Sequence, residues 1–334
     1  MSVKRENIYF ATWLRVLGVL LILLCHFTQQ SGNTYLIMSS QFFNIGNDIF
    51  FIMSGFLFGI SGSKRYTQVL PWYKKRFTRI YLPYELMIVT LFVLHIMLGY
   101  RLDHIQWIKQ FFGVHGWDGV YGATQTWFVT SILLCYVFTP IISITTNEIC
   151  TERKRLTKAV LFWSILPAVM AYTFGGIVDI SIFIPICWYA LAFILGANFD
   201  RVPIKRVYAI YAFVIMCVGF GVRLIGRKLC DGTILYNQII AGYTHAIGAL
   251  CIFYILAVVF RDIKPVKPIV WFANISYEIY LWHYMFTDGP LRIFGITNYW
   301  VLDCLVVFVI TVLVALFANK ISDLMIKRIS ERKV

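Results

Sequence analysis

Apolar residues run in long windows along almost the whole chain, and short polar segments separate them. Each window is roughly 18 to 24 residues long, the length of helix needed to cross the hydrocarbon core of a bilayer. The pattern predicts an all-α fold, a polytopic membrane helix bundle of about ten transmembrane helices. The expected spans cover residues 9–30, 42–60, 80–99, 125–145, 159–178, 180–198, 207–225, 237–260, 269–287 and 298–319.

Composition agrees with a membrane protein. Hydrophobic residues make up 60% of the 334 residues and charged residues only 14%, far from the profile of a soluble globular domain. No internal repeat, low-complexity linker or long extramembrane segment divides the spans, so we expect a single domain over residues 1–334. The first apolar run contains Arg15 and lacks a small-residue cleavage site, so we expect a retained span and not a removable signal peptide.

Lysine and arginine concentrate at both termini and in alternate connections between the spans. With the N-terminus placed in the cytoplasm, most of the 30 basic residues fall on the inner side, a strong positive-inside signal. Both termini are therefore predicted to be cytoplasmic, and this topology explains the net charge of +14 without a nucleic-acid partner. The inner basic residues are Lys4, Arg5, Lys64, Arg65, Lys74, Lys75, Arg76, Arg79, Arg153, Lys154, Arg155, Lys158, Arg201, Lys205, Arg206, Arg261, Lys264, Lys267, Lys320, Lys327, Arg328, Arg332 and Lys333.

Two ionisable side chains lie within the first expected span, Arg15 and, further along, His26. At 100° per residue this spacing places both on one helical stripe, about 16 Å apart along the axis. A charge inside a bilayer costs about 2.5 to 3.5 kcal/mol, so an intramembrane ionisable residue is by default a functional hypothesis that needs a partner.

Asp48 supplies a candidate partner for His26. It lies in the outer part of the second expected span, at a depth similar to that of His26. A carboxylate beside an imidazole fixes its tautomer and raises its basicity, as a general base requires. The alternative is a neutral His26 bonded to a backbone carbonyl and an Asp48 that caps the second helix.

A basic cluster precedes the third expected span. Its Arg76 and Arg79 are three positions apart and share a helix face, so they could hold a phosphate bidentately. The alternative is a positive-inside anchor that touches anionic lipid.

Several other polar or aromatic segments have both a structural and a functional interpretation. Ser276, Tyr280 and His283 form a polar stripe at helical spacing, which serves either a site or a structural hydrogen-bond network. Trp127 begins the fourth expected span and by itself is typical of an interfacial anchor. Residues 105–112 form either an interfacial amphipathic helix or an irregular loop. The eight cysteines show no metal-ligand spacing, so no metal is expected.

Taken together, these segments resemble the acyltransferase-3 family of integral membrane acyltransferases, which O-acetylate cell-surface polysaccharides, peptidoglycan and related carbohydrates. The resemblance covers nearly the whole chain. The chain departs from the family at Lys75, where many members have a second arginine, and it stops at Val334 without the extracytoplasmic esterase-like domain that some members append. The matching segments are the Arg15 and His26 pair, Asp48–Phe56, Arg76–Pro83, Trp127–Phe128 and Ile275–His283.

The resemblance implies that a cytoplasmic acyl-CoA, usually acetyl-CoA, donates the acyl group to a carbohydrate acceptor at the cell membrane. Some members fused to an amino-acid racemase domain look like serine uptake modules, so a transporter for a small amino acid stays open as an alternative. The candidate catalytic residues are His26 and Asp48, those for binding the donor are Arg15, Arg76 and Arg79, and those for binding the acceptor are Trp127, Ser276, Tyr280 and His283.

Overall fold

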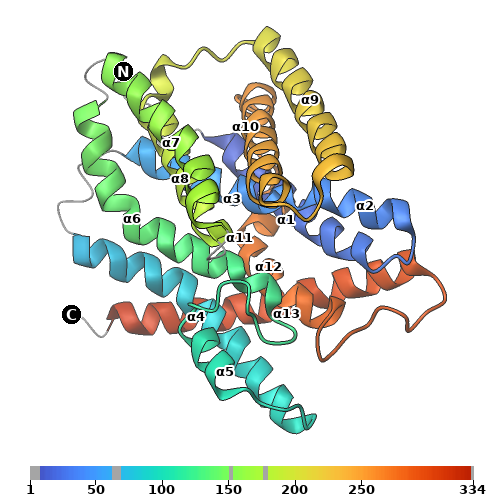
Figure 1. Cartoon of the computed structure of the whole chain (residues 1–334). Coiled ribbons are helices and arrows are strands. Elements are labelled where there is room, and N and C mark those ends of the chain that lie inside the picture. Colours follow the sequence, from blue (N-terminus) through green and yellow to red (C-terminus); the bar gives the residue numbers. More distant parts are fainter. Residues whose placement is uncertain (1–7, 62–68, 150–152, 176–179, 332–334) are drawn as a thin grey trace.

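The structure is a computed structural model that describes residues 8–61, 69–149, 153–175 and 180–331. In these ranges all regular structure is helical and no strand occurs, which confirms the all-α prediction. Figure 1 shows the arrangement. The helices are α1 (Tyr9–Gln29), α2 (Thr34–Phe43), α3 (Ile45–Ser61), α4 (Val69–Met97), α5 (His104–Phe111), η3 (Thr124–Thr126), α6 (Trp127–Ile149), α7 (Arg153–Phe174), η4 (Ile180–Ile182), α8 (Ile184–Ala197), η5 (Phe199–Arg201), α9 (Arg206–Cys230), η6 (Leu235–Ile240), α10 (Ala241–Val259), α11 (Lys267–Asn274), α12 (Ser276–Thr287) and α13 (Trp300–Glu331).

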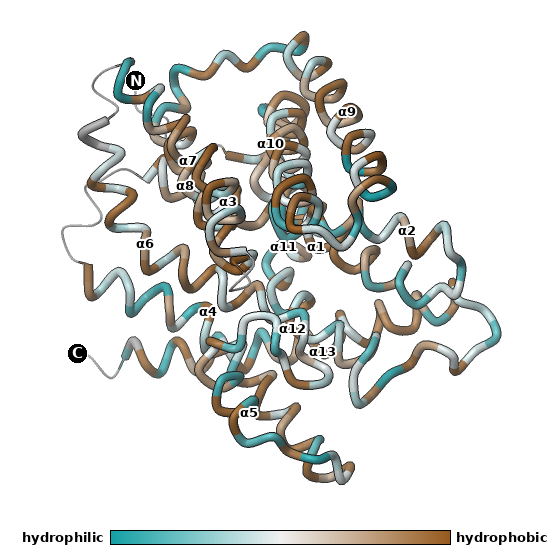
Figure 2. The backbone as a smooth tube through the Cα atoms, viewed as in Figure 1, coloured by the Kyte–Doolittle hydropathy of each residue, from teal (hydrophilic) through white to brown (hydrophobic). Residues whose placement is uncertain are grey.

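Nine helical segments within the described ranges are long and apolar enough to cross a membrane. They coincide with nine of the predicted spans, and Figure 2 shows hydrophobic residues along most of the length of the long helices. The tenth predicted span, 269–287, is helical but is divided at Ile275 into α11 and α12. At this break the Ser276 hydroxyl donates to the Ala273 carbonyl oxygen over 2.8 Å, a local bond that competes with the regular helical pattern.

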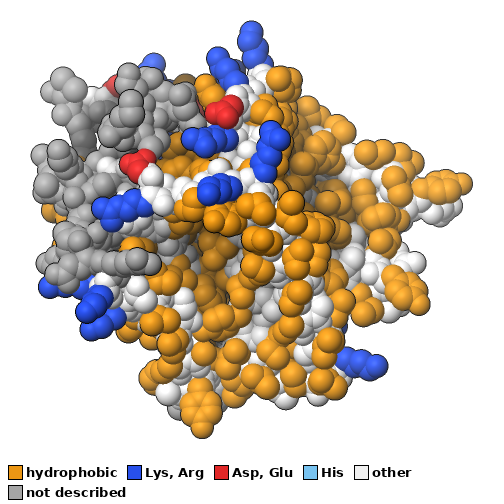
Figure 3. All heavy atoms as spheres, turned by 90° about the horizontal axis from the view of Figure 1, so that it is seen from above, with side chains coloured by type: hydrophobic (Ala, Val, Ile, Leu, Met, Phe, Trp, Pro, Cys, Tyr) orange, Lys and Arg blue, Asp and Glu red, His pale blue; other side chains and the backbone are white. Residues whose placement is uncertain are grey.

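Charged side chains are unevenly distributed on the surface. Figure 3 shows one face on which hydrophobic side chains predominate, while lysine and arginine gather toward one side. The orientation of the two termini relative to a membrane stays a prediction. Some residues behind that prediction lie outside the described ranges, namely Lys4, Arg5, Lys64, Arg65, Arg332 and Lys333.

The central helices α3 and α8 pack closely through glycine. A Cβ atom added at Gly55 would overlap the carbonyl oxygen of Tyr189, and one at Gly59 would overlap the carbonyl oxygen of Phe193. From the other side, a Cβ atom added at Gly196 of α8 would overlap the Phe56 carbonyl oxygen in the same way. Gly55 and Gly59 form a GxxxG pattern, which lets two membrane helices bring their backbones together. This contact holds α3, and with it one wall of the cavity described below.

Replacing Gly55 with alanine is expected to destabilise the protein by about 1 to 3 kcal/mol, because the added methyl group must push two buried backbones apart. Thermal unfolding in detergent would show this as a lower melting temperature. Gly219→Ala is the matched control, since a Cβ at this helical position meets no atom within 4 Å. An equal effect of the two substitutions would contradict the close-packing argument.

The segment for which the sequence left a choice between helix and loop is helical. Asp103 caps α5, because its carboxylate accepts from the backbone N–H of Gln106 over 3.0 Å. Trp107 faces inward, with 4% of its surface exposed, whereas Ile105 and Ile108 are 69% and 57% exposed. The helix therefore carries apolar side chains on its outer face as well as on its buried one.

Candidate active site

A cavity of about 370 Å³ lies between the C-terminal part of α1 and the hairpin of α9 and α10. Its walls come from α1, α2, α3, α9, α10 and α12, from the π-helix η6, and from the segments that lead into α6. The lining side chains are mainly polar or aromatic, in contrast to the apolar cores packed around α4 and around α3. A cavity of this size and polarity inside an apolar bundle is a candidate site for a polar small molecule or one end of a larger one.

His26 lines this cavity from α1 and is half-buried. Its Nδ1 atom lies 3.1 Å from the side-chain oxygen of Gln29. Because an amide oxygen only accepts hydrogen bonds, Nδ1 carries the ring proton and Nε2 keeps its lone pair. The imidazole is thus held in the tautomer in which Nε2 is able to take a proton from a hydroxyl.

His283 of α12 lies beside His26, with the ring centroids 5.1 Å apart. Its Nδ1 atom donates to the carbonyl oxygen of Tyr280 over 2.7 Å, so its lone pair is also on Nε2. The His283 side chain is fully buried, and its Nε2 has no hydrogen-bond partner among the described residues. His26, which lines the cavity, therefore has a second imidazole packed beside it, and His283 itself is not part of the lining.

The sequence suggested Asp48 as the partner of His26, but in the structure Asp48 pairs with another histidine. Its Oδ2 atom lies 3.7 Å from Nδ1 of His245 on α10. The Nε2 atom of His245 donates to the backbone oxygen of Gln41 over 2.7 Å. The depth of Asp48 follows from its position in the sequence, but its direction depends on how α3 is rotated. Asn47, one residue and about 100° earlier on the helix, lines the cavity instead.

Among the described residues, the carboxylate that interacts electrostatically with His26 is Asp288, directly after α12. Asp288 accepts a hydrogen bond from the Tyr284 hydroxyl over 3.3 Å. The Tyr284 ring meets the His26 ring edge to face, with centroids 5.0 Å apart. Sequence analysis missed Asp288, although its place in the sequence Asp288-Gly289-Pro290, at the end of an apolar helix, marks it as a polar helix terminus.

Two stacked tryptophans form an aromatic wall of the cavity. The rings of Trp117 and Trp127 are 4.3 Å apart at an interplanar angle of 23°. Trp117 is fixed by a hydrogen bond of 2.6 Å from its indole N–H to the hydroxyl of Ser181. Nearby, buried His115 is hydrogen-bonded to Thr126 over 2.9 Å, and burial lowers the pKa of His115 to about 4, so it is neutral at neutral pH. The predicted site residue Trp127 therefore lines the cavity.

The predicted polar stripe on α12 divides between the cavity and the helix break. Tyr280 lines the cavity, and its hydroxyl donates to the backbone oxygen of Gln125. The Gln125 side chain donates to the Leu281 carbonyl over 3.0 Å, whereas its own oxygen is buried and has no donor among the described residues. Ser276 is engaged at the break between α11 and α12. Of the stripe, Tyr280 lines the cavity, His283 lies beside His26, and Ser276 lies at the helix break away from the lining.

The three predicted donor-binding arginines converge away from this cavity. Arg15 interacts electrostatically with Arg79 and with buried Tyr136, and Tyr136 interacts with Arg76 as well. The Arg76 guanidinium lies 4.5 Å from the centroid of the Phe58 ring. Arg15 and His26 belong to the same helix, about 16 Å apart along its axis at 1.5 Å per residue. The cluster and the cavity are thus joined by one face of α1.

The other wall of the cavity contains residues that the sequence analysis did not assign to a site, among them Arg223, Arg227 and Tyr236. Arg223 could have been identified in the way that Arg15 was, because both are charged residues inside an expected membrane span. Among the described residues, no group of three or more His, Cys, Asp or Glu side chains could hold a metal ion.

The chain matches a family model described as "Acyltransferase domain" over residues 8–320. No curated protein and no solved structure matches it.

Proposed function

Because the chain belongs to the acyltransferase-3 family, over residues 8–320, and is a multi-pass membrane acyltransferase, we propose that it uses cytoplasmic acetyl-CoA or another short acyl-CoA. The acceptor is a hydroxyl of a cell-surface or lipid-linked carbohydrate. The observation that carries the proposal is the placement of His26, with a basic Nε2, in a polar cavity joined by one helix to a cluster of arginines.

The arginine cluster supports an acyl-CoA donor. Coenzyme A carries phosphates, and Arg15, Arg76 and Arg79 offer guanidinium groups that bind phosphate through paired hydrogen bonds. The pantetheine arm of the donor is a long extended chain, so it can follow the face of α1 from the arginines toward His26. With both termini in the cytoplasm of a cell-membrane protein, the arginines lie toward the inner side, where acyl-CoA is available.

The aromatic wall and the free amide oxygens support a carbohydrate acceptor. Trp117 and Trp127 present flat apolar surfaces on which a sugar ring can pack. The side-chain oxygens of Asn47 and Gln125 are buried without donors among the described residues, and both residues line the cavity. Hydroxyl groups of a bound sugar would supply those donors.

Acyl transfer requires a general base for the acceptor hydroxyl and a group that stabilises this base once it is protonated. His26 Nε2 takes the proton of the acceptor hydroxyl as its oxygen attacks the thioester carbonyl carbon. The new C–O bond forms, the C–S bond breaks, and the proton on His26 passes to the departing thiolate, which leaves as the free thiol of coenzyme A. Asp288 stabilises the imidazolium during this step, because it is the carboxylate that acts electrostatically on His26.

One observation favours the transporter alternative. Asp48, His245 and Arg223 form a polar group between α3, α9 and α10, and such intramembrane groups also occur in proton-coupled transporters. In that function a small zwitterion such as serine would occupy the cavity in place of a sugar.

Binding of acetyl-CoA to the purified protein separates the two functions. We expect saturable binding by calorimetry, release of coenzyme A when an oligosaccharide acceptor is added, and no displacement by serine. Serine binding and serine uptake into proteoliposomes, without any acetyl-CoA binding, would overturn the acyltransferase proposal for this chain.

A further inference from the structure

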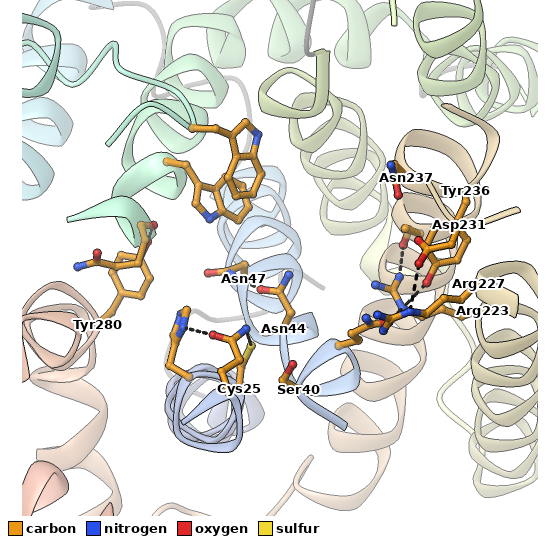
Figure 4. A pocket seen from close by; sticks show the side chains of 17 residues that line it. Cys25, Ser40, Asn44, Asn47, Arg223, Arg227, Asp231, Tyr236, Asn237 and Tyr280 are labelled. Carbon is orange, nitrogen blue, oxygen red and sulfur yellow. Dashed lines mark hydrogen bonds and ion pairs between the residues drawn. The ribbon is translucent and has the colours of Figure 1, made fainter. Parts of the chain in front are cut away.

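The wall of the cavity opposite His26 is basic and comes from one hairpin, α9, η6 and α10. Figure 4 shows Arg223, Arg227, Asp231, Tyr236 and Asn237 grouped on one side, away from Tyr280 and Cys25, with Asn44 and Asn47 between the two groups. A molecule that reaches His26 and fills the cavity must therefore also face this wall. The side chains of this wall therefore indicate which chemical groups the acceptor has in addition to the reacting hydroxyl.

Arg223 is an incompletely satisfied buried cation. Only 7% of its surface is exposed, although it faces the cavity. Its Nη1 group donates to the Ala241 carbonyl over 2.9 Å and to the Thr244 hydroxyl over 3.4 Å. Its Nε–H is buried and has no acceptor among the described residues. These bonds fix the guanidinium plane and leave part of the donor fork for a ligand.

The charges around the wall leave an excess of positive charge in the cavity lining. The lining contains Arg223 and Arg227 but, of the acidic residues, Asp231 alone among those described. Asp231 lies 3.7 Å from Arg227, and both side chains are partly exposed, so this pair is weak. Asp48 acts electrostatically on Arg223 but is next to His245 and does not belong to the lining. An anionic group on the ligand would neutralise this excess positive charge.

The hairpin has an unusual local structure at this point. Residues Leu235–Ile240 form a π-helix, which is rare and occurs frequently at functional sites. It places Tyr236 and Asn237 in the lining next to the arginines. Tyr236 is itself anchored, since its hydroxyl lies 3.5 Å from the side-chain oxygen of Gln41. Arg223 and Tyr236 are thus both held by hydrogen bonds to neighbouring helices or turns, so this wall presents its donors in fixed positions.

We propose that Arg223 and Arg227 bind an anionic group, a carboxylate or a phosphate, of the same molecule that presents its hydroxyl to His26. The acceptor is thus an acidic carbohydrate. This inference rests on the proposed function only for the identity of the reacting hydroxyl. The anion site itself follows from the positions of the two arginines in the cavity wall. Arginine suits both groups, because its planar fork binds two oxygens at once.

Binding measured without any donor tests the site. The probes are an oligosaccharide that ends in a uronic acid, the same oligosaccharide that ends in the neutral hexose, and its 6-phosphate. We expect wild type to bind one or both acidic probes at least about tenfold more tightly than the neutral one, and Arg223→Gln to remove this preference. Preference for the uronic acid over the phosphate, or the reverse, identifies which anion the site takes.

Two further variants keep the test decisive. Lys228→Gln removes a neighbouring exposed charge that is not in the lining, and it is expected to retain the preference. Arg227→Gln changes a half-buried residue and is expected to weaken the preference even if Arg223→Gln unfolds, as judged by its melting temperature. Equal affinity of wild type for acidic and neutral probes overturns the inference. Preference for acidic probes without any acetyl transfer leaves the anion site in place and instead counts against the proposed function.

Discussion

His26→Gln is expected to lower acyl transfer by about 100- to 10,000-fold, the usual contribution of a positioned general base. Glutamine has a size and polarity similar to those of histidine but cannot take up a proton near neutral pH. Release of coenzyme A and acylation of the acceptor should fall together, while binding of acetyl-CoA at the arginine cluster should change little. Assays with the purified protein at saturating acetyl-CoA would measure this loss.

His95→Gln is the matched control for this substitution. Like His26, His95 is a helical histidine with one ring nitrogen hydrogen-bonded, in this case to the Tyr121 backbone oxygen over 3.0 Å. It is buried on α4, away from the cavity lining. We expect its activity to stay within a few-fold of wild type. Full activity of His26→Gln, with a normal melting temperature, would remove His26 from the mechanism and point to another base.

The second large effect is expected for the donor. Simultaneous Arg76→Gln and Arg79→Gln substitution should weaken the binding of coenzyme A by at least about tenfold, because each charge-assisted bond to phosphate is worth about 1.5 to 3 kcal/mol. The affinity of wild type should fall as salt is added, and that of the variant should fall less steeply, because fewer screened charge pairs remain. Calorimetry with coenzyme A at two salt concentrations measures both effects.

Arg201→Gln with Arg206→Gln makes the matched control for the arginine cluster. These two arginines are exposed and lie on the same predicted side of the membrane, around η5 and the start of α9. The control removes the same charge and should leave affinity for coenzyme A unchanged. If the Arg76 and Arg79 variant also binds like wild type in detergent without anionic lipid, the alternative of a lipid anchor is the better explanation of this cluster.

The two arginine groups are proposed to bind different substrates, and the substitutions can separate these two roles. Loss of Arg76 and Arg79 is expected to act on the donor, and loss of Arg223 on the acceptor, while His26 acts on the chemical step. Because the arginine cluster lies away from the cavity, its effect on donor affinity should be nearly independent of the effect of Arg223 on acceptor preference. A variant that changed all three quantities together would indicate a general loss of structure.

The sequence alone determined the membrane-spanning helices and the depth of their polar residues. It could do so because a chain that crosses a bilayer must form long apolar helices. Apolar length determined the helices, and helical periodicity placed Arg15 and His26 on one face of α1. The convergence of Arg15 with Arg76 and Arg79 was also predictable, since all three lie at a similar depth among basic residues. These are properties of single helices and of their depth, which follow from the order of residues.

Only the tertiary structure decided how the helices face one another. Asp48 has the depth of His26, but the rotation of α3 turns Asp48 to His245 and presents Asn47 to the cavity. The partners of His26 come from elsewhere, with Gln29 one turn away, His283 on α12 and Asp288 directly after α12. The rotation of a helix about its axis is set by packing, such as the glycine contact between α3 and α8. The pattern of apolar residues along the sequence does not specify that packing.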